Sequence, residues 1–150
     1  MADVVATVII TVSSALLFGY WFRYTCLLIL TAKTARDYGC EVAEANHLCF
    51  PKVQSKLRER AVANLDRLRD CLDRDYIVVI YMLGHTTPSY TEGVLEKLML
   101  AIDYRMLGAW YRVSCRVFPN AARHALEEMS LVVAHFANAM GERVANTSAA

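Results

Sequence analysis

The stretch from Val4 to Phe22 holds 19 residues without a charged side chain, and Arg23 follows it directly. At about 1.5 Å per residue, a helix of this length measures close to 30 Å, which is the thickness of the hydrocarbon core of a bilayer. A charge at the bilayer centre costs about 3 kcal/mol or more, so a span that ends at Arg23 is favoured over a span that contains it. The sequence therefore predicts a transmembrane anchor over residues 1–23.

The end of the predicted span is rich in aromatic side chains, which favour the headgroup region of a membrane. The residues expected at this interface, together with the arginine, are Tyr20, Trp21, Arg23 and Tyr24. A secretory signal peptide is the alternative, but it would carry a cation before the apolar stretch and small residues after it. The chain has Asp3 before the stretch and bulky residues after it, so we expect an uncleaved anchor.

The charges on either side of the span predict its orientation. Arg23, Lys33 and Arg36 follow the apolar stretch, whereas only Asp3 and the terminal amine precede it. Positive side chains accumulate on the cytoplasmic side of membrane proteins. We therefore expect a single-pass membrane protein whose C-terminal body lies on the cytoplasmic side.

Small residues recur at every fourth position of the span. Such a stripe lies along one face of a helix and lets membrane helices approach each other closely. It consists of Thr7, Thr11, Ala15 and Gly19. The stripe predicts self-association or contact with another membrane protein through the span, in addition to membrane lipid; the alternative is that small residues are simply common in spans.

The composition narrows the range of functions. Hydrophobic residues make up 56% of the chain, above the usual 45–50% or so, and the N-terminal part accounts for much of the excess. The formal net charge of +1 gives no reason to expect a nucleic-acid partner. The five cysteines are an odd number and none are spaced as CxxC, so we expect reduced thiols and no cofactor.

Beyond the span, apolar residues recur at helical spacing. The first helix is expected to continue unbroken to about Asn46, and a second to run from Pro51 to about Leu83. Apolar positions of the second helix are Val53, Leu57, Ala61, Leu65, Leu68, Leu72, Val79 and Leu83. Gly84 is expected to end this helix in the left-handed conformation, with Pro88 as a stop. A capping box over Ser89–Glu92 predicts the start of the third helix.

The third helix is expected over about Tyr90–Val117, and a fourth begins at Pro119–Asn120. The third is apolar over much of its circumference: Val94, Leu95, Leu98, Ile102, Met106, Trp110, Val113 and Val117. Its Gly108 indicates close packing against a neighbour. The fourth carries a heptad-like seam: Ala122, Leu126, Met129, Val133, Phe136 and Met140.

These elements predict an all-α fold in which one N-terminal transmembrane helix continues into a compact antiparallel bundle of about four helices. The bundle would span residues 24–145 and lie in the cytosol, and residues 146–150 would form a flexible tail.

Charged side chains in the body offer only weak site candidates. The pairs Asp66–Arg69, Arg69–Asp73 and Asp70–Arg74 have helical spacing and are interpreted as a solvated face. A second, loose cationic stripe consists of Arg105, Arg112, Arg116 and Arg123. It could meet acidic lipid headgroups if it faced a membrane, but Asp103 and Glu127–Glu128 dilute it, so a solvated face is favoured.

The weak candidates for metal ligands are His124, Glu128 and His135, which share a stripe of the fourth helix. The Glu-x-x-His pairs of di-iron bundles are absent, and no catalytic motif accompanies these residues. The sequence favours a non-catalytic membrane protein that acts as an accessory, scaffold or assembly subunit of a membrane-associated complex. The alternative is a membrane-tethered helical bundle that binds a metal or haem.

Overall fold

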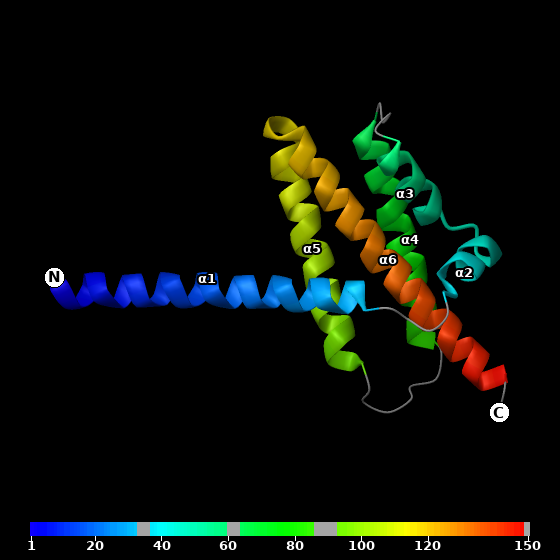
Figure 1. Ribbon diagram of the computed structural model, residues 1–150, viewed down its shortest axis with the longest axis horizontal. Helices are drawn as coiled ribbons and strands as arrows, with labels where there is room; N and C mark the ends of the chain where they lie inside the picture. Colours follow the sequence, from blue (N-terminus) through cyan, green and yellow to red (C-terminus); the bar gives the residue numbers. More distant parts are fainter. Residues whose placement is uncertain (33–36, 60–63, 86–92, 149–150) are drawn as a thin grey trace. The chain divides into compact units, whose positions relative to one another are not determined.

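The computed structural model describes residues 1–32, 37–59, 64–85 and 93–148, and within these ranges every regular element is a helix (Figure 1). The chain divides into two units, Met1–Lys33 and Thr34–Ala150. The first holds the single helix α1, and the second, called the body below, holds the helices α2 to α6. The all-α prediction is confirmed for the described residues.

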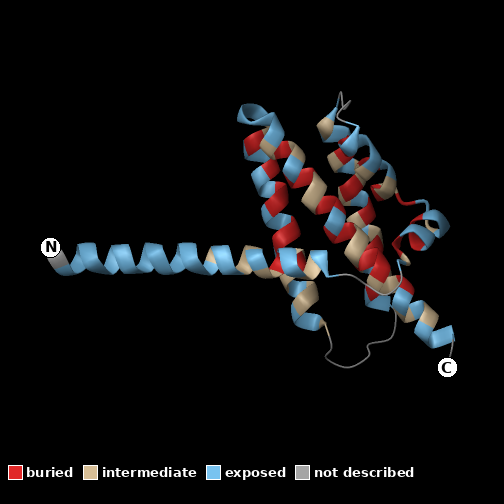
Figure 2. Cartoon of the chain, viewed as in Figure 1, coloured by how far each residue is buried: buried red, intermediate tan, exposed pale blue. Residues whose placement is uncertain are grey.

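Helix α1 (Ala2–Thr31) is by length and composition able to cross a membrane. Its mean hydropathy reaches 1.9, and none of its most apolar 18-residue window is buried (Figure 2). The hydroxyls of Thr7, Thr11 and Thr25 each donate a hydrogen bond of 2.8–2.9 Å to the carbonyl four residues earlier. These bonds satisfy polar groups that would otherwise be costly to place in lipid.

Helix α1 ends at Thr31, so the prediction of one unbroken helix to about Asn46 is wrong. Ala32 already has an extended backbone, and the next helix in the described residues is α2 (Gly39–Ala45). Polar side chains of the body accept the backbone N–H groups just before α2 and at its first residue. The N–H of Tyr38 donates to Asn138 Oδ1 at 2.6 Å, and the N–H of Gly39 donates to Asp37 Oδ1 at 2.9 Å.

The helix expected from Pro51 to Leu83 is in fact two helices, α3 (Phe50–Arg58) and α4 (Leu65–His85). Asn64 causes part of this break, because its Oδ1 accepts the N–H of Arg67 at 3.1 Å and so caps the start of α4. Most of the expected apolar positions in the described residues are nevertheless buried: Val53, Leu57, Leu68, Leu72, Val79 and Leu83. Ala61 lies outside the described residues.

Charged side chains from other helices hold both ends of α3. Asp75 of α4 is 3% exposed, and its Oδ2 accepts the N–H groups of Cys49 and Phe50 at 2.6 and 2.7 Å. At the other end, Arg123 Nη2 donates to the carbonyl of Leu57 at 2.7 Å. Burial raises the pKa of Asp75, while the two N–H donors oppose that rise. Both side chains have the sign that complements the helix dipole.

Helix α4 continues through Gly84 to His85, so the expected left-handed end at Gly84 is wrong. The left-handed glycine is instead Gly93, with φ of 86°, and it directly precedes α5 (Val94–Val117). The third helix therefore begins a turn later than expected. The capping box over Ser89–Glu92 and the expected stop at Pro88 lie outside the described residues.

Helix α6 (Pro119–Ser148) is the central element of the body, and α2, α3, α4 and α5 all pack against it. In Figure 1 it runs between α5 and α4, and in Figure 2 buried residues follow its length. Its predicted seam is confirmed: Ala122, Leu126, Met129, Val133 and Phe136 are 0–1% exposed, whereas Met140 is half-buried. The helix reaches Ser148 and so includes the start of the expected tail.

The described residues of the body carry five helices instead of about four, because α2 and α3 are short separate elements. Helix α5 runs antiparallel to both α4 and α6. Its Tyr111 and Tyr104 meet Asp66 and Asp73 of α4 in opposite chain order. Gly108 is buried and faces Met129 of α6, but a Cβ at Gly108 would lie 4.0 Å from Met129 Cε, an ordinary contact, so the packing does not require glycine here.

Gly141 allows α2 to approach α6. A Cβ at this position would overlap the Cβ of Tyr38 and lie 3.1 Å from Val42 Cγ2. The backbone-anchored part of Tyr38 cannot move away by a side-chain rotation. We infer that this contact, together with the bond from Tyr38 N–H to Asn138, fixes the start of α2.

We expect Gly141→Ala to lower the free energy of unfolding of the body by about 1–3 kcal/mol, because the added methyl overpacks the α2–α6 contact. Gly84→Ala is the matched control, since Gly84 is also helical but has open space around a Cβ. That change should leave stability unchanged or raise it by up to about 1 kcal/mol. Thermal unfolding of the full chain in detergent, followed by circular dichroism, compares the two; equal melting curves would contradict the packing argument.

Candidate interaction face on helices α4 and α5

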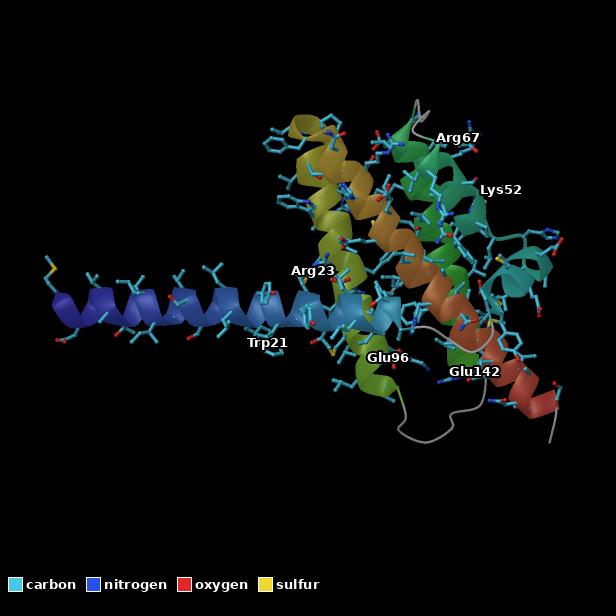
Figure 3. All side chains as sticks on the ribbon, viewed as in Figure 1. Trp21, Arg23, Lys52, Arg67, Glu96 and Glu142 are labelled. Carbon is cyan, nitrogen blue, oxygen red and sulfur yellow. The ribbon has the colours of Figure 1, made fainter. Side chains whose placement is uncertain are left out.

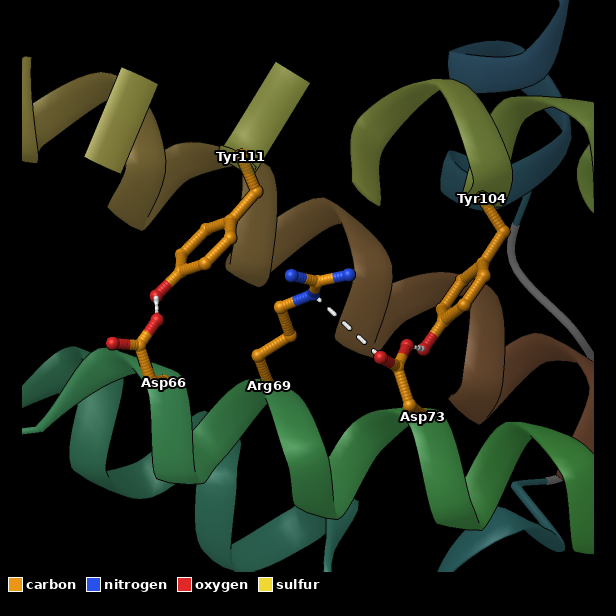
Figure 4. A network of polar contacts seen from close by, with 5 residues as sticks. All are labelled: Asp66, Arg69, Asp73, Tyr104 and Tyr111. Carbon is orange, nitrogen blue, oxygen red and sulfur yellow. Dashed lines mark hydrogen bonds and ion pairs between the residues drawn. The ribbon is translucent and has the colours of Figure 1, made fainter. Parts of the chain in front are cut away.

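Two tyrosines of α5 reach across to two aspartates of α4. The hydroxyl of Tyr111 donates to Asp66 Oδ1 at 2.8 Å, and that of Tyr104 donates to Asp73 Oδ1 at 2.9 Å. Arg69 lies between these pairs (Figure 4). Its Nε is 3.6 Å from Asp73 Oδ2, and its guanidinium carbon is 5.3 Å from the ring centre of Tyr111.

This polar cluster corrects the interpretation of the α4 charges as a solvated face for Arg69, whereas Asp66, Asp70 and Arg74 are exposed as expected. The side chain of Arg69 is only 18% exposed, and the aspartates on either side of it bond to α5. The spacing explains the match: Asp66 and Asp73 are seven residues apart, as are Tyr104 and Tyr111. Seven residues make about two turns, so the two aspartates lie on one side of α4 and the two tyrosines lie on one side of α5. This equal spacing is visible in the sequence and could have indicated the pairing.

The tyrosines of the cluster act as hydrogen-bond donors. Burial raises the pKa of Tyr104 far above its usual range, and the carboxylate of Asp73 adds to the effect. Burial and the hydrogen bond to Asp66 raise the pKa of Tyr111 in the same way. Both phenols therefore keep their protons at neutral pH, which suits a structural role and makes them poor general bases.

A groove of about 400 Å³ opens beside the cluster between α4 and α5. Tyr76 and Tyr104 stack within it, with ring centres 4.0 Å apart and planes at 4°. The residues that line the groove are Arg69, Asp73, Tyr76, Ile77, Tyr104, Arg105, Gly108, Ala109 and Arg112. Three of these side chains are guanidinium groups and one is a carboxylate, so the groove is net cationic and suited to an anionic group.

Helix α5 has two different sides. Leu100, Leu107 and Tyr111 are buried in the body. All eight large apolar residues that the sequence identifies on this helix are instead 43–69% exposed: Val94, Leu95, Leu98, Ile102, Met106, Trp110, Val113 and Val117. The remaining exposed residues of α5 are Ala109, Arg105, Arg112 and Arg116. Every exposed residue of α5 is thus either apolar or an arginine.

The expected cationic stripe is divided by the structure. Arg105, Arg112 and Arg116 lie on the exposed side of α5, whereas Arg123 bonds to the carbonyl at the end of α3. The acidic residue expected to dilute the stripe on α5, Asp103, is fully buried. The arginines of α5 therefore stand beside apolar residues, without an exposed acidic neighbour on their own helix.

The three weak metal-ligand candidates are not brought together around one point. His124 is 79% exposed and lies 3.3 Å from Glu127, while His135 Nε2 lies 2.7 Å from Glu96 of α5. Glu128 is half-buried. Among the described residues, no three His, Cys, Asp or Glu side chains gather in a group that could hold a metal ion.

The residues expected to contact membrane or partner helices are accessible within α1. Tyr20 and Tyr24 stack one turn apart, and Trp21 packs edge-on to Tyr24; side chains stand out along the helix (Figure 3). A Cβ at Gly19 would meet nothing within 4 Å. The hydroxyl protons of Thr7 and Thr11 are used inside the helix, so toward a partner these oxygens offer mainly acceptor capacity.

No protein-family model, no curated protein and no solved structure matches this chain. The function must therefore be inferred from the helices themselves. Two features are available for that inference: the apolar helix α1, and the exposed face of α5 with the arginine-lined groove beside it.

The tyrosine–aspartate pairs predict a specific pH dependence. A phenol whose pKa is raised by folding contributes stability that is fully present below its ordinary value near pH 10 and is lost as the pH rises beyond it. We expect Tyr104→Phe to lower the free energy of unfolding by about 1–2 kcal/mol at pH 7. It should also flatten the fall in stability above about pH 10.

Thermal unfolding at pH 7 and at about pH 11 measures both effects. Tyr81→Phe is the control, because Tyr81 is 65% exposed on α4. An equally steep alkaline loss of stability in Tyr104→Phe and Tyr81→Phe would disprove the role assigned to Tyr104.

Proposed function

We propose that this chain is a single-pass membrane protein and serves as a non-catalytic accessory, scaffold or assembly subunit of a membrane-associated complex. Helix α1 carries the proposal. It is 30 residues long, strongly apolar, and its most apolar window has no buried residue, so it lacks the burial of a core helix in a soluble protein. Its threonine hydroxyls bond within the helix, which lipid requires.

The same proposal places the body on the cytoplasmic side. Arg23, Lys33 and Arg36 follow the apolar stretch, as the positive-inside rule requires for that side. The five cysteines are an odd number without CxxC spacing, which favours reduced thiols and a reducing compartment. Trp21 and its aromatic neighbours would then lie at the cytoplasmic headgroups.

A supporting role, instead of a catalytic one, agrees with the chemistry of the body. Its polar side chains connect helices: the buried Asp75 and the half-buried Arg123 hold α3, and Asp66 and Asp73 bond to α5. Burial and the neighbouring Asp75 raise the pKa of Cys49, which keeps that thiol protonated and weakly nucleophilic.

Lateral contacts in the membrane would use the small-residue stripe of Thr7, Thr11, Ala15 and Gly19. Lipid tails provide no hydrophobic force between helices, so close backbone approach has to supply the attraction. The partner is a second copy of the chain or another membrane protein.

We expect Cys40 to react with a membrane-impermeant thiol reagent only after the membrane is breached. Cys40 is the best reporter because it is the exposed cysteine of the five. Ala2→Cys provides the opposite control and should be labelled in intact cells. Labelling of Cys40 from outside intact cells would reverse the assigned orientation.

We expect Gly19→Leu to weaken self-association or to lose a membrane partner, because the larger side chain separates the helices. Hydropathy and membrane insertion should be retained. Leu17→Ile is the matched control on another face of the helix. Copies with two different tags are co-purified in mild detergent, and the bound proteins are identified by mass spectrometry. If neither variant nor parent retains any partner, the accessory-subunit proposal fails; if Gly19→Leu keeps every partner, the contact lies elsewhere.

A further inference from the structure

The exposed side of α5 is ordered around the helix axis. At 100° per residue, Arg105, Arg112 and Arg116 fall within an arc of about 40°. Next to them, an arc of about 80° contains Ile102, Met106, Trp110, Val113 and Val117. The remaining arc faces the body, where Tyr104, Leu107 and Tyr111 are buried. We call the first two arcs together the α5 face.

The composition of the α5 face is typical of helices that lie in a membrane interface. Such helices combine apolar side chains and tryptophan with flanking cations, and they bind membranes that contain acidic lipids. The α5 face has Trp110 at 54% exposure, and none of the exposed residues of α5 is acidic. An arginine can place its aliphatic stem along apolar surface while its guanidinium reaches the headgroups.

We propose that the α5 face binds the surface of an acidic lipid bilayer, with its apolar residues in the outer acyl region and its arginines on lipid phosphates. The arginine-lined groove between α4 and α5 adjoins this face and offers the exposed Arg105 and Arg112 to a headgroup. This inference rests on the proposed function, since it assigns the body to the same membrane that α1 would cross.

Chain length and charge favour lipid over a protein partner. From Thr31 at the end of α1 to Gly39 at the start of α2 there are eight residue steps. At about 3.5 Å per step, this connection reaches no further than about 28 Å, and the eight residues of α1 beyond Arg23 add about 12 Å, so a body attached to a spanning helix stays within about 40 Å of the headgroups. The cytoplasmic leaflet supplies the negative charge that Arg105, Arg112 and Arg116 complement.

The two tryptophans of the chain allow a direct test. In the full-length Trp21→Phe variant, Trp110 is the remaining tryptophan and reports on the α5 face. In Trp110→Phe, the remaining Trp21 reports on α1. Each protein is reconstituted into vesicles whose lipids carry bromine near the top of the acyl chains, either with about 30% phosphatidylglycerol or with phosphatidylcholine alone.

We expect bromine to quench Trp21 in both kinds of vesicle and Trp110 only in the acidic ones. About 0.5 M NaCl should weaken the quenching of Trp110, since salt screens the headgroup charge. A triple variant should shift the equilibrium between the lipid-bound and the unbound α5 face by about a hundredfold toward the unbound state. This variant carries Arg105→Glu, Arg112→Glu and Arg116→Glu.

The matched control reverses three exposed cations on other helices: Lys52→Glu, Lys56→Glu and Arg67→Glu (Lys52 and Arg67 are labelled in Figure 3). It changes the net charge equally and should keep the quenching of Trp110. Circular dichroism melts establish that both triple variants are folded.

Three results would overturn the proposal. Quenching of Trp21 without quenching of Trp110 leaves the span intact and rejects the lipid contact of α5. Protection of Trp110 from acrylamide without bromine quenching shows that protein covers the face, either a second copy or a partner. Absence of quenching at Trp21 rejects the spanning helix, and with it both the proposed function and this inference.

Discussion

Burial against α6 is the constraint on which the body depends. Helices α2, α3, α4 and α5 each pack on α6, whereas no Cα of α4 lies within 8 Å of one of α5. Small and medium residues such as Ala122, Ala125 and Ala137 are fully buried along α6 and let its neighbours approach. The space that remains between α4 and α5 is bridged by long side chains, in which Tyr104 and Tyr111 reach Asp73 and Asp66. The polar cluster and its groove thus follow from the way α6 holds two helices apart.

Short helices in the body need more than apolar contacts. Isolated helices of seven or nine residues are unstable in water, because nucleation is unfavourable and few hydrogen bonds follow it. In α3, Asp75 accepts a backbone N–H at the start of the helix and Arg123 donates to a backbone carbonyl near its end. Both side chains come from other helices. In α2 the chain is fixed by Asn138, which accepts the N–H of Tyr38, and by the close approach at Gly141. The hydrogen bonds of Asn138 and Arg123 connect residues 100 and 66 positions apart in sequence, and those of Asp75 connect residues 25 and 26 positions apart, so local patterns do not reveal them.

The sequence could predict what depends on local periodicity and could not predict what depends on tertiary partners. The all-α class, the long α1 and the buried seam of α6 follow from spacing and length, and the described residues confirm them. The break before Gly39 was missed because Asn138, which accepts the N–H of Tyr38, lies on another helix. The break after Arg58 was missed although Asn64 is a local capping residue. The α4 charges were taken as solvated because their partners Tyr104 and Tyr111 lie on another helix.

Many of the chain's large apolar residues lie outside the core of the body. The body buries one side of α5 and most of the apolar residues of α6, yet it leaves Leu98, Trp110 and Val113 more than half exposed. Helix α1 likewise exposes residues such as Leu16 and Phe18. Scattered apolar residues on a surface need no explanation, but a continuous apolar face on α5 does, in a chain that also carries the strongly apolar helix α1. A single bilayer would cover both the exposed apolar residues of α5 and those of α1. Without a bilayer, each of these two surfaces would need a protein partner. The arginines in the middle and the C-terminal part of α5 favour the bilayer, because an acidic headgroup layer complements Arg105, Arg112 and Arg116 together.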